Sequence, residues 1–310
     1  MVILITGGFS FIGHHLSQYL AQKGMEVVTV TRNVGKYSKR IDKEPFRCVE
    51  GDLADKGFLE RVFREHRPEI VIHLAWCGVT GPDRNSPDQE KNLLINQNLL
   101  EMSGRGGSRL FIGFGSQGEY GVQNRRIDEQ VLPTPHTLYG VYKLAAGLVG
   151  RLFAETYHFK YAWLRLFSTF GPGDHEYYVI PYVITSLLKG EPPRLTLCEQ
   201  RWDYLYVKDI PPLVWRVINK EEDFCDIFNL CSGRSHVLKE IVLTITDCLG
   251  SSIEPVFGAI PYRKDGLFHL EGENRKFKDT FGWTGLTDLK NAMIETVAWF
   301  KDEYERGYKR

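Results

Sequence analysis

Short apolar runs alternate with amphipathic stretches along the first half of the chain. Six runs have the length and composition of buried strands, over residues 2–5, 26–31, 47–50, 69–74, 109–114 and 161–167. The stretches between them carry apolar residues at helical spacing, over residues 11–23, 55–66, 88–102 and 139–157. The pattern therefore predicts strands and helices in alternation.

Buried strands that alternate with helices are typical of right-handed βαβ units in a parallel sheet covered on both faces. We therefore predict an α/β fold with a doubly wound parallel sheet of the Rossmann type. From about Ser168 the pattern is less regular, with helices expected over residues 180–189, 209–219, 237–249 and 286–304. We assign residues 1–167, with a returning segment at about 204–235, to a dinucleotide-binding domain. Residues 168–310 would form mainly a smaller, interleaved α/β lobe for substrate.

The turn after the first strand has the features of a phosphate site. Gly7 and Gly13 occupy two glycine positions of the G-x-x-G-x-x-G spacing of a dinucleotide-binding turn, and Ser10 replaces the third glycine. A strand that leads through glycines into a helix presents free amides and the positive end of the helix dipole. The Ser10 hydroxyl can donate to a phosphate, so the pattern favours a dinucleotide but also fits a tight turn without ligand.

Composition excludes several classes of partner. The chain has 39 basic and 39 acidic residues, so no bulk charge favours nucleic acid or an anionic membrane surface. No apolar run approaches the ~20 residues of a membrane span. The six cysteines are scattered and read as buried free thiols of a reducing compartment. The cysteine usage and the lack of a spanning run lead us to expect a cytoplasmic protein. The nine histidines form no zinc-binding pattern, so we expect no metal.

A tyrosine and a lysine lie four residues apart in the helix that follows the fifth strand. Tyr139 and Lys143 would share one helix face, and an ammonium beside a phenol favours the phenolate. Ser116 follows the fifth strand, so its hydroxyl would emerge at the same edge of the sheet. The three groups are those needed to polarise a carbonyl and protonate the alkoxide that hydride addition produces. A hydrolase is disfavoured, because Phe114 stands where the G-x-S-x-G motif requires glycine.

Several ordered motifs resemble those of one family. They are TGGFSFIG, GDLAD, HLAW, SQGEYG, YGVYK, RLFSTFGPG, WDYLYVKD, FNLCSG and a final FGW. Together they resemble the extended short-chain dehydrogenases/reductases of the nucleotide-sugar epimerase, dehydratase and reductase superfamily, over nearly the whole chain. The resemblance implies an enzyme that binds a nicotinamide cofactor and a nucleotide-diphosphate sugar.

The resemblance also implies roles for individual residues. Ser116 would hold the sugar oxygen, Tyr139 would transfer the proton, and Lys143 would bind the nicotinamide ribose and tune Tyr139. The cofactor would further contact Gly7, Ser10, Phe11, Ile12, Gly13, Thr31, Arg32, Asp52, Leu53, Leu74, Ala75, Trp76, Asn92, Thr169 and Phe170. The substrate would further contact Gln117, Ser168, Arg201 and Arg263.

Departures from the family pattern narrow the range of cofactors and reactions that the resemblance allows. The second strand ends in Thr31 and Arg32, where an acid that binds the ribose 2′-hydroxyl is usual, so we favour NADP(H) over NAD(H). The 4,6-dehydratases of the family carry two acids where this chain has Gln117 and Gly118, so a dehydratase is disfavoured. The asparagine expected at Ser168 is missing, and the expected diphosphate arginine is shifted to Arg201.

The leading hypothesis is an NADPH-dependent reductase of the 4-keto group of a nucleotide-linked (6-deoxy)hexose. The alternative is a nucleotide-sugar 4-epimerase that retains NAD, and a third reading is a regulator that senses NADP(H) without turnover. The helices around residues 93–102 and 144–153 carry more apolar surface than one sheet face requires. In the family such helices pair in a four-helix bundle, so we expect a homodimer.

Overall fold

The computed structural model describes residues 1–35, 44–262, 266–283 and 285–307 of the chain. Its larger sheet has seven parallel strands in the order β10-β7-β5-β4-β1-β2-β3. In chain order these strands are β1 (Val2–Thr6), β2 (Glu26–Thr31), β3 (Arg47–Glu50), β4 (Ile70–His73), β5 (Leu110–Ser116), β7 (Lys160–Leu166) and β10 (Cys225–Leu230). This is the predicted doubly wound sheet.

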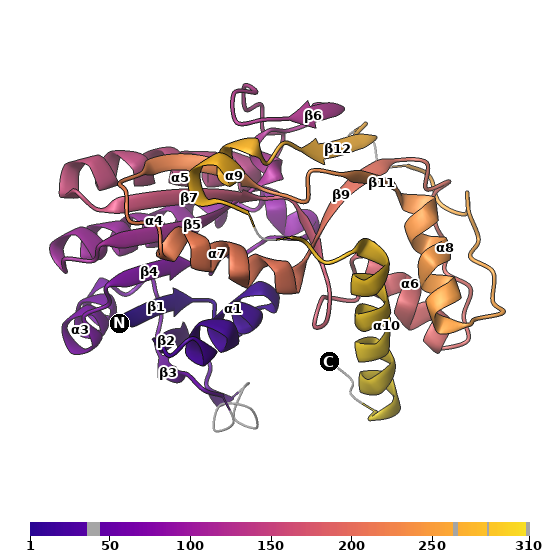
Figure 1. Cartoon of the computed structure of the whole chain (residues 1–310), viewed down its shortest axis with the longest axis horizontal. Helices are drawn as coiled ribbons and strands as arrows, with labels where there is room; N and C mark the ends of the chain where they lie inside the picture. The colour runs from indigo at the N-terminus through magenta and orange to yellow at the C-terminus, as the bar shows by residue number, and fades with distance from the viewer. Residues whose placement is uncertain (36–43, 263–265, 284, 308–310) are drawn as a thin grey trace.

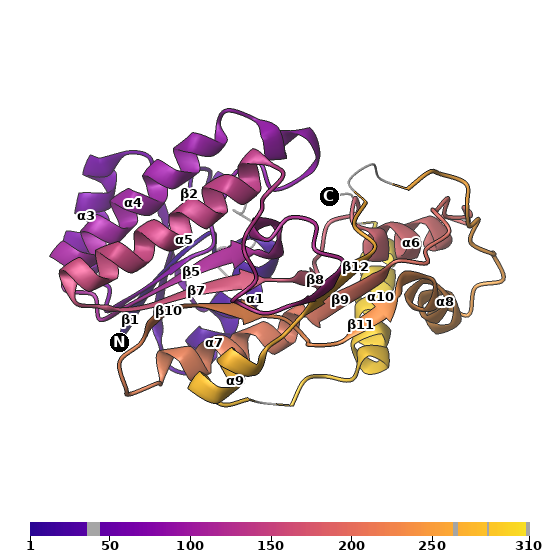
Figure 2. The same ribbon diagram turned by 90° about the horizontal axis from the view of Figure 1, so that it is seen from above.

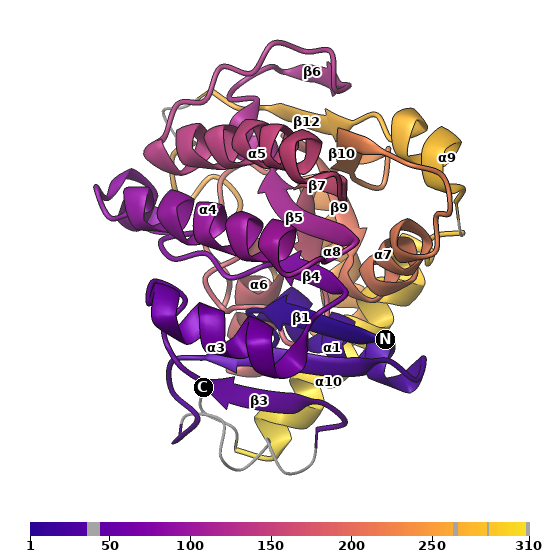
Figure 3. The ribbon, with the colours of Figure 1, turned by 90° about the vertical axis from the view of Figure 1, so that its left-hand side faces the viewer.

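Helices cover both faces of this sheet, as Figure 3 shows from the side. On one face lie α3 (Lys56–His66), α4 (Gln89–Arg105) and α5 (Leu138–Tyr157); on the other lie α1 (Phe11–Gln22), α7 (Ile210–Ile218) and α9 (Arg275–Phe281). Successive residues of a strand point to opposite faces, so Ile3 and Ile5 belong to one buried cluster and Leu4 to the other. Two apolar cores therefore hold the sheet between its helices.

A second layer of structure lies beyond one end of the large sheet (Figures 1 and 2). A smaller sheet has the order β11-β9-β12-β6, and β8 pairs with β9. Its strands are β6 (Arg125–Ile127), β8 (Ser168–Phe170), β9 (Arg201–Tyr206), β11 (Ser235–Val237) and β12 (His269–Gly272). Beside them pack α6 (Val179–Leu188), α8 (Leu238–Leu249) and α10 (Leu289–Glu305), which share a third apolar core. The chain contributes β6 to this layer between β5 and α5, enters the layer again after β7 and returns to the large sheet for β10.

Two details differ from the sequence-based expectations. The fifth strand continues past Phe114 to Ser116, because Ser116 pairs with Leu166 of β7 and its amide donates to the Glu119 carboxylate. The cysteines in the described part of the chain are free, but Cys77 is exposed, so the expectation that all six thiols are buried is wrong.

No helix among the described residues is long and apolar enough to cross a membrane.

Candidate active site

Two glycines at the junction of β1 and α1, Gly7 in the turn and Gly13 in the first turn of the helix, leave no room for a side chain. Gly7 has a φ of +77°, and a Cβ atom there would lie 2.9 Å from the Ala75 amide nitrogen. A Cβ atom at Gly13 would lie 2.1 Å from the Gly7 carbonyl oxygen. These contacts are the tight turn and the close packing of helix against strand that the first and third glycines of a dinucleotide-binding turn provide.

Ser10 caps the helix that follows this turn. Its hydroxyl oxygen accepts a hydrogen bond from the Gly13 amide at 3.2 Å, as an N-cap residue does. The hydroxyl hydrogen remains available to donate outward, and the first amides of a helix have no carbonyl partner within it. Phe11 and Ile12 form the first turn of α1. The residues of the turn thus fit the phosphates of a dinucleotide.

Arg32 lies above the same edge of the sheet. It follows Thr31 at the end of β2, and its Nη2 atom lies 3.6 Å from the Cys77 sulfur, beyond the end of β4. Because β1 lies between β2 and β4, the Arg32 side chain crosses the carboxyl end of β1. Asp52 is exposed and accepts the Ala54 amide, whereas the side chain of its neighbour Leu53 is buried.

The segment after β4, which contains Leu74, Ala75 and Trp76, is held by two amide side chains of α4. Asn92 accepts the Cys77 amide at 2.9 Å and donates to the Cys77 carbonyl at 3.0 Å. Gln89 accepts from the Trp76 indole at 2.9 Å and donates to the Gly78 carbonyl at 2.7 Å. Asn92, predicted to border the cofactor, therefore uses its side chain to position this segment. Gln89 also positions this segment, a role that the sequence analysis did not predict.

Ser116, Tyr139 and Lys143 come together at the carboxyl end of β5. Ser116 is the last residue of this strand, and its hydroxyl donates to Gln117 at 3.1 Å and accepts from the Gly118 amide at 3.1 Å. Tyr139 is in the first turn of α5, capped by Thr137, and its side chain is hydrogen-bonded to Ser116. A hydroxyl, a phenol and an amine thus meet at one edge of the parallel sheet.

The ionisation of Tyr139 differs from the expectation. Burial raises the pKa of its phenol, since only 9% of the residue is exposed, while the hydrogen bond with Ser116 and the charge of Arg84 act in the opposite direction. The expectation that Lys143 lowers this pKa is therefore wrong for this arrangement. The physical reason is that desolvation of the phenolate outweighs the favourable interactions.

Lys143 is directed toward other groups. Its Nζ atom donates to the Phe114 carbonyl at 2.5 Å and lies 3.8 Å from the centre of the Trp76 ring, but 6.0 Å from that of Tyr139. Only 4% of the residue is exposed, and burial lowers the pKa of its amine to about 7. The amine is therefore only partly charged at neutral pH.

A buried ion pair lies directly beneath Ser116 and was not predicted. The Glu119 carboxylate accepts the Ser116 amide at 2.9 Å, the Trp163 indole at 2.9 Å and the Arg165 guanidinium at 2.7 Å. Both members of the pair are almost completely buried. Because a buried charge without its partner is costly, this pair fixes the turn that carries Ser116.

Arg84 is a further residue that the sequence did not reveal. It lies in the 3₁₀ helix η2 (Gly81–Asn85), and its guanidinium carbon is 4.6 Å from the centre of the Tyr139 ring. Its Nη2 atom lies 2.9 Å from the position that a Cβ atom would take at Gly118. The Arg84 guanidinium therefore packs against the Tyr139 ring and against the turn that follows Ser116.

The predicted substrate residues are less clearly assembled. The Ser168 hydroxyl accepts from the Trp202 indole at 2.7 Å, and Thr169 donates to the Phe167 carbonyl. Phe170 is fully buried. Arg201 donates to the Ser235 carbonyl at 2.8 Å, so its guanidinium is tied to β11. Arg263 lies outside the described residues.

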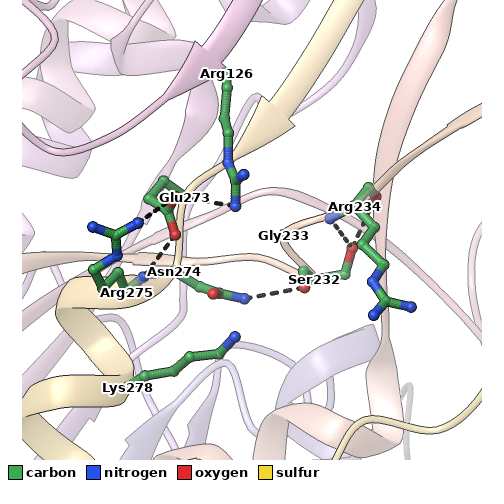
Figure 4. A pocket seen from close by; sticks show the side chains of 8 residues that line it. All are labelled: Arg126, Ser232, Gly233, Arg234, Glu273, Asn274, Arg275 and Lys278. Atoms are coloured by element: carbon green, nitrogen blue, oxygen red, sulfur yellow. Dashed lines mark hydrogen bonds and ion pairs between the residues drawn. The ribbon is translucent and has the colours of Figure 1, made fainter.

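A pocket of about 380 Å³ lies elsewhere, beside the smaller sheet (Figure 4). In it Arg126 pairs with Glu273 at 3.0 Å. Its lining residues are Arg126, Ser232, Gly233, Arg234, Glu273, Asn274, Arg275 and Lys278. None of them is a predicted site residue, so this pocket is distinct from the group around Ser116. Within the described residues, no cluster of three or more histidine, cysteine or acidic side chains is arranged to hold a metal.

Residues 3–231 match the model of a family described as the NAD dependent epimerase/dehydratase family. The UDP-glucose 4-epimerase of Halalkalibacterium halodurans is 24% identical over 331 residues, covering 99% of this chain and 98% of that protein. The GDP-6-deoxy-D-mannose reductase of Pseudomonas aeruginosa is 26% identical over 305 residues, covering 94% of each.

The chain is also similar in fold to solved structures. The UDP-glucose 4-epimerase of Thermotoga maritima, solved with UDP-glucose, has a TM-score of 0.89 at 27% identity, covering 98% of this chain and 100% of that one. The UDP-glucose 4-epimerase of Thermus thermophilus, solved with NAD, has a TM-score of 0.85 at 26% identity, covering 100% of both chains. The predicted fold class is therefore confirmed.

Proposed function

Because the chain belongs to the NAD dependent epimerase/dehydratase family of enzymes, we propose that it is an NADPH-dependent reductase. Its substrate would be the 4-keto group of a nucleotide-linked (6-deoxy)hexose. The observation that carries this proposal is that Ser116, Tyr139 and Lys143 meet at the carboxyl edge of the parallel sheet, the same edge at which the glycine turn follows β1. Such a set suits reduction of a carbonyl, since NADPH supplies a hydride to carbon and the oxygen then requires a proton.

Each group of the set has a defined task in the proposal. The Ser116 hydroxyl holds the carbonyl oxygen, and Tyr139, whose side chain is hydrogen-bonded to Ser116, gives its proton to that oxygen. The raised pKa of Tyr139 keeps the phenol protonated at neutral pH, as a proton donor requires. Lys143 lies one helical turn further on and would bind the nicotinamide ribose.

Two features support a reductase with a phosphorylated cofactor. Arg32 lies across the end of β1, and in the described part of the chain no carboxylate forms an ion pair with it. Its guanidinium suits the 2′-phosphate of NADPH, and an acid that would repel this phosphate is missing at Thr31. Gln117 and Gly118 supply no acid for the elimination of water.

The second candidate is a nucleotide-sugar 4-epimerase that retains NAD. It is favoured by the likeness to UDP-glucose 4-epimerases, one of which was solved with NAD. An epimerase returns the hydride to the same sugar and consumes no cofactor, whereas a reductase oxidises one NADPH for each sugar reduced. A non-catalytic NADP(H) sensor would do neither.

The test offers the purified chain NADPH and a panel of nucleotide 4-keto-6-deoxyhexoses. We expect stoichiometric loss of NADPH absorbance and a 4-hydroxy sugar nucleotide identified by NMR. Tyr139→Phe should lose most turnover and still bind NADPH, while Tyr142→Phe on the same helix should keep its activity. Interconversion of 4-epimers without NADPH loss would replace the reductase with the epimerase, and an active Tyr139→Phe variant would refute both.

A further inference from the structure

The pocket beside the smaller sheet lies where three separate parts of the chain meet (Figure 4). One wall comes from β6, a second from the loop between β10 and β11, and a third from α9 and the residues that join it to β12. Its volume of about 380 Å³ is within the range of small-molecule sites. The pocket can therefore hold a small ligand, and segments distant in sequence build it.

A buried aspartate fixes the loop wall of this pocket. The Asp203 carboxylate of β9 is fully buried and accepts from the Ser232 amide at 2.9 Å and from the Gly233 amide at 3.1 Å. It also accepts from the Gly272 amide, at the end of β12, at 3.1 Å. One carboxylate thus ties the loop after β10 to the strand that leads toward α9.

Asn274 fixes the same loop from the side of α9. The residue is only 2% exposed, and its side chain donates to the Ser232 carbonyl at 3.0 Å and to the Cys231 carbonyl at 3.2 Å. Gly233 has a φ of +80°, and a Cβ atom there would lie 2.8 Å from the Asn274 Nδ2 atom. The backbone of the pocket is therefore held in one shape, which requires glycine at position 233.

Four cationic side chains line the pocket, and their charge is only partly compensated. Arg126 pairs with Glu273 at 3.0 Å and with Glu271 at 3.7 Å. In the described part of the chain, no carboxylate forms an ion pair with Arg234 or Lys278. The four cations therefore exceed these two carboxylates by two charges; they are Arg126, Arg234, Arg275 and Lys278.

These cations reach the pocket from different sides. Figure 4 shows the Lys278 side chain on one side of Asn274 and the Arg126 guanidinium on the other. The Lys278 amine lies 4.8 Å from the centre of the Trp283 ring, so an aromatic ring rather than an acid is its neighbour. Like charges that line one pocket repel each other, and an anion between them would remove this repulsion.

We propose that this pocket binds a phosphate monoester, a small phosphorylated molecule additional to the substrate. At neutral pH the phosphate group of a monoester has a charge of about −1.5 to −2, which matches the surplus of two positive charges. Guanidinium and ammonium groups donate strong hydrogen bonds to phosphate oxygens. A single carboxylate would bring only one negative charge and would leave the surplus half compensated.

Equilibrium dialysis of the full chain against glucose 6-phosphate tests the proposal, with glucose as the uncharged control probe. In about 0.15 M sodium chloride we expect saturable binding of glucose 6-phosphate and none of glucose. Arg234→Gln combined with Lys278→Gln should weaken this binding about tenfold or more, because two charged hydrogen-bond donors are lost. Arg61→Gln combined with Lys301→Gln, a matched change at exposed positions of α3 and α10, should leave it unchanged.

The measurement needs neither cofactor nor sugar nucleotide, so its outcome is separate from that of the proposed function. Circular dichroism verifies that each variant is folded, and if the Arg234 and Lys278 double variant does not fold, the single variants replace it, each with an expected loss of about threefold or more. Equal affinity in the two double variants would place the phosphate elsewhere and overturn the proposal. Binding that is seen only at lower salt would indicate an adventitious ion only and would equally overturn it.

Discussion

Lys143 is a buried amine that the fold maintains at an energetic cost. In an unfolded chain its amine titrates near 10.5, whereas burial lowers the pKa in the folded protein to about 7. As the pH falls between these values, the unfolded chain gains a proton that the folded chain does not. The stability of the protein therefore decreases over this interval, by about 1.4 kcal/mol for each pH unit.

We predict that Lys143→Met is more stable than the original chain at neutral pH and inactive. Methionine fills a similar volume beside Trp76 and Trp163 without a buried charge, and the gain should be on the order of 4 kcal/mol at about pH 7. Urea denaturation at several pH values measures it, and the gain should vanish as the pH approaches 10.5. Lys301→Met, on the exposed face of α10, is the control. A destabilised Lys143→Met at neutral pH would contradict this account.

The residues of the site differ in whether the sequence alone predicts their roles. Tyr139 and Lys143 are four positions apart on one helix, so a local spacing is enough to pair them. Glu119 and Arg84 depend on contacts with β7 and α5, which lie far away in the chain. No local pattern predicts such contacts. For the same reason the effect of burial on the Tyr139 pKa could not be foreseen.

At the scale of elements, two glycines allow α5 to pack closely against the sheet. A Cβ atom at Gly147 would lie 2.8 Å from the Trp163 ring, and one at Gly150 would lie 2.2 Å from the Tyr161 hydroxyl. These glycines of α5 face two large aromatic side chains of β7. The distance between helix and sheet, and with it the position of Tyr139 relative to Ser116, is therefore set by the thickness of the rings.

We predict that Gly147→Ala reduces the turnover number about tenfold or more although residue 147 is two helical turns from Tyr139. The added methyl group pushes α5 away from Trp163, and small displacements of a catalytic group lower rates strongly. Steady-state kinetics measures the loss, and NADPH affinity should change little. Gly285→Ala, where a Cβ atom meets open space, is the matched control. Full activity in Gly147→Ala would show that the helix tolerates a wider spacing.

The elements themselves were largely predictable, since each strand of the large sheet except β10 has a compact apolar run. β10 and the strands of the smaller sheet were not individually assigned. β6, β8 and β11 are three residues long, too short for a periodic pattern, and form only through pairing with partners distant in sequence. The division into two domains stays a prediction.

For the whole molecule, the outer surfaces of α4 and α5 carry apolar side chains. Leu148 is 47% exposed, Leu152 60% and Leu94 52%. The two helices pack side by side on the same face of the sheet (Figure 2). An exposed apolar strip along two neighbouring helices is typical of an interface between subunits.

We predict that the chain is a homodimer and that Leu148→Glu combined with Leu152→Glu yields a monomer. Two charges in an apolar interface would have to be buried without partners, so association should weaken by a factor of 100 or more, equivalent to ~3 kcal/mol. Sedimentation equilibrium measures the oligomeric state. The control, Leu243→Glu combined with Ile294→Glu on exposed positions of α8 and α10, should leave it unchanged. A monomeric original chain would refute the prediction.

The place of β10 has a consequence for how the protein is made. β7 ends at Leu166 and its neighbour β10 begins at Cys225, so 58 residues must be translated between the two strands. At bacterial or eukaryotic rates of 5–20 residues per second, a ribosome needs about 3 to 12 seconds for them. During that time the nascent chain exposes an unpaired apolar strand edge, which is a site of aggregation. Expression of residues 1–167 alone would make that exposure permanent.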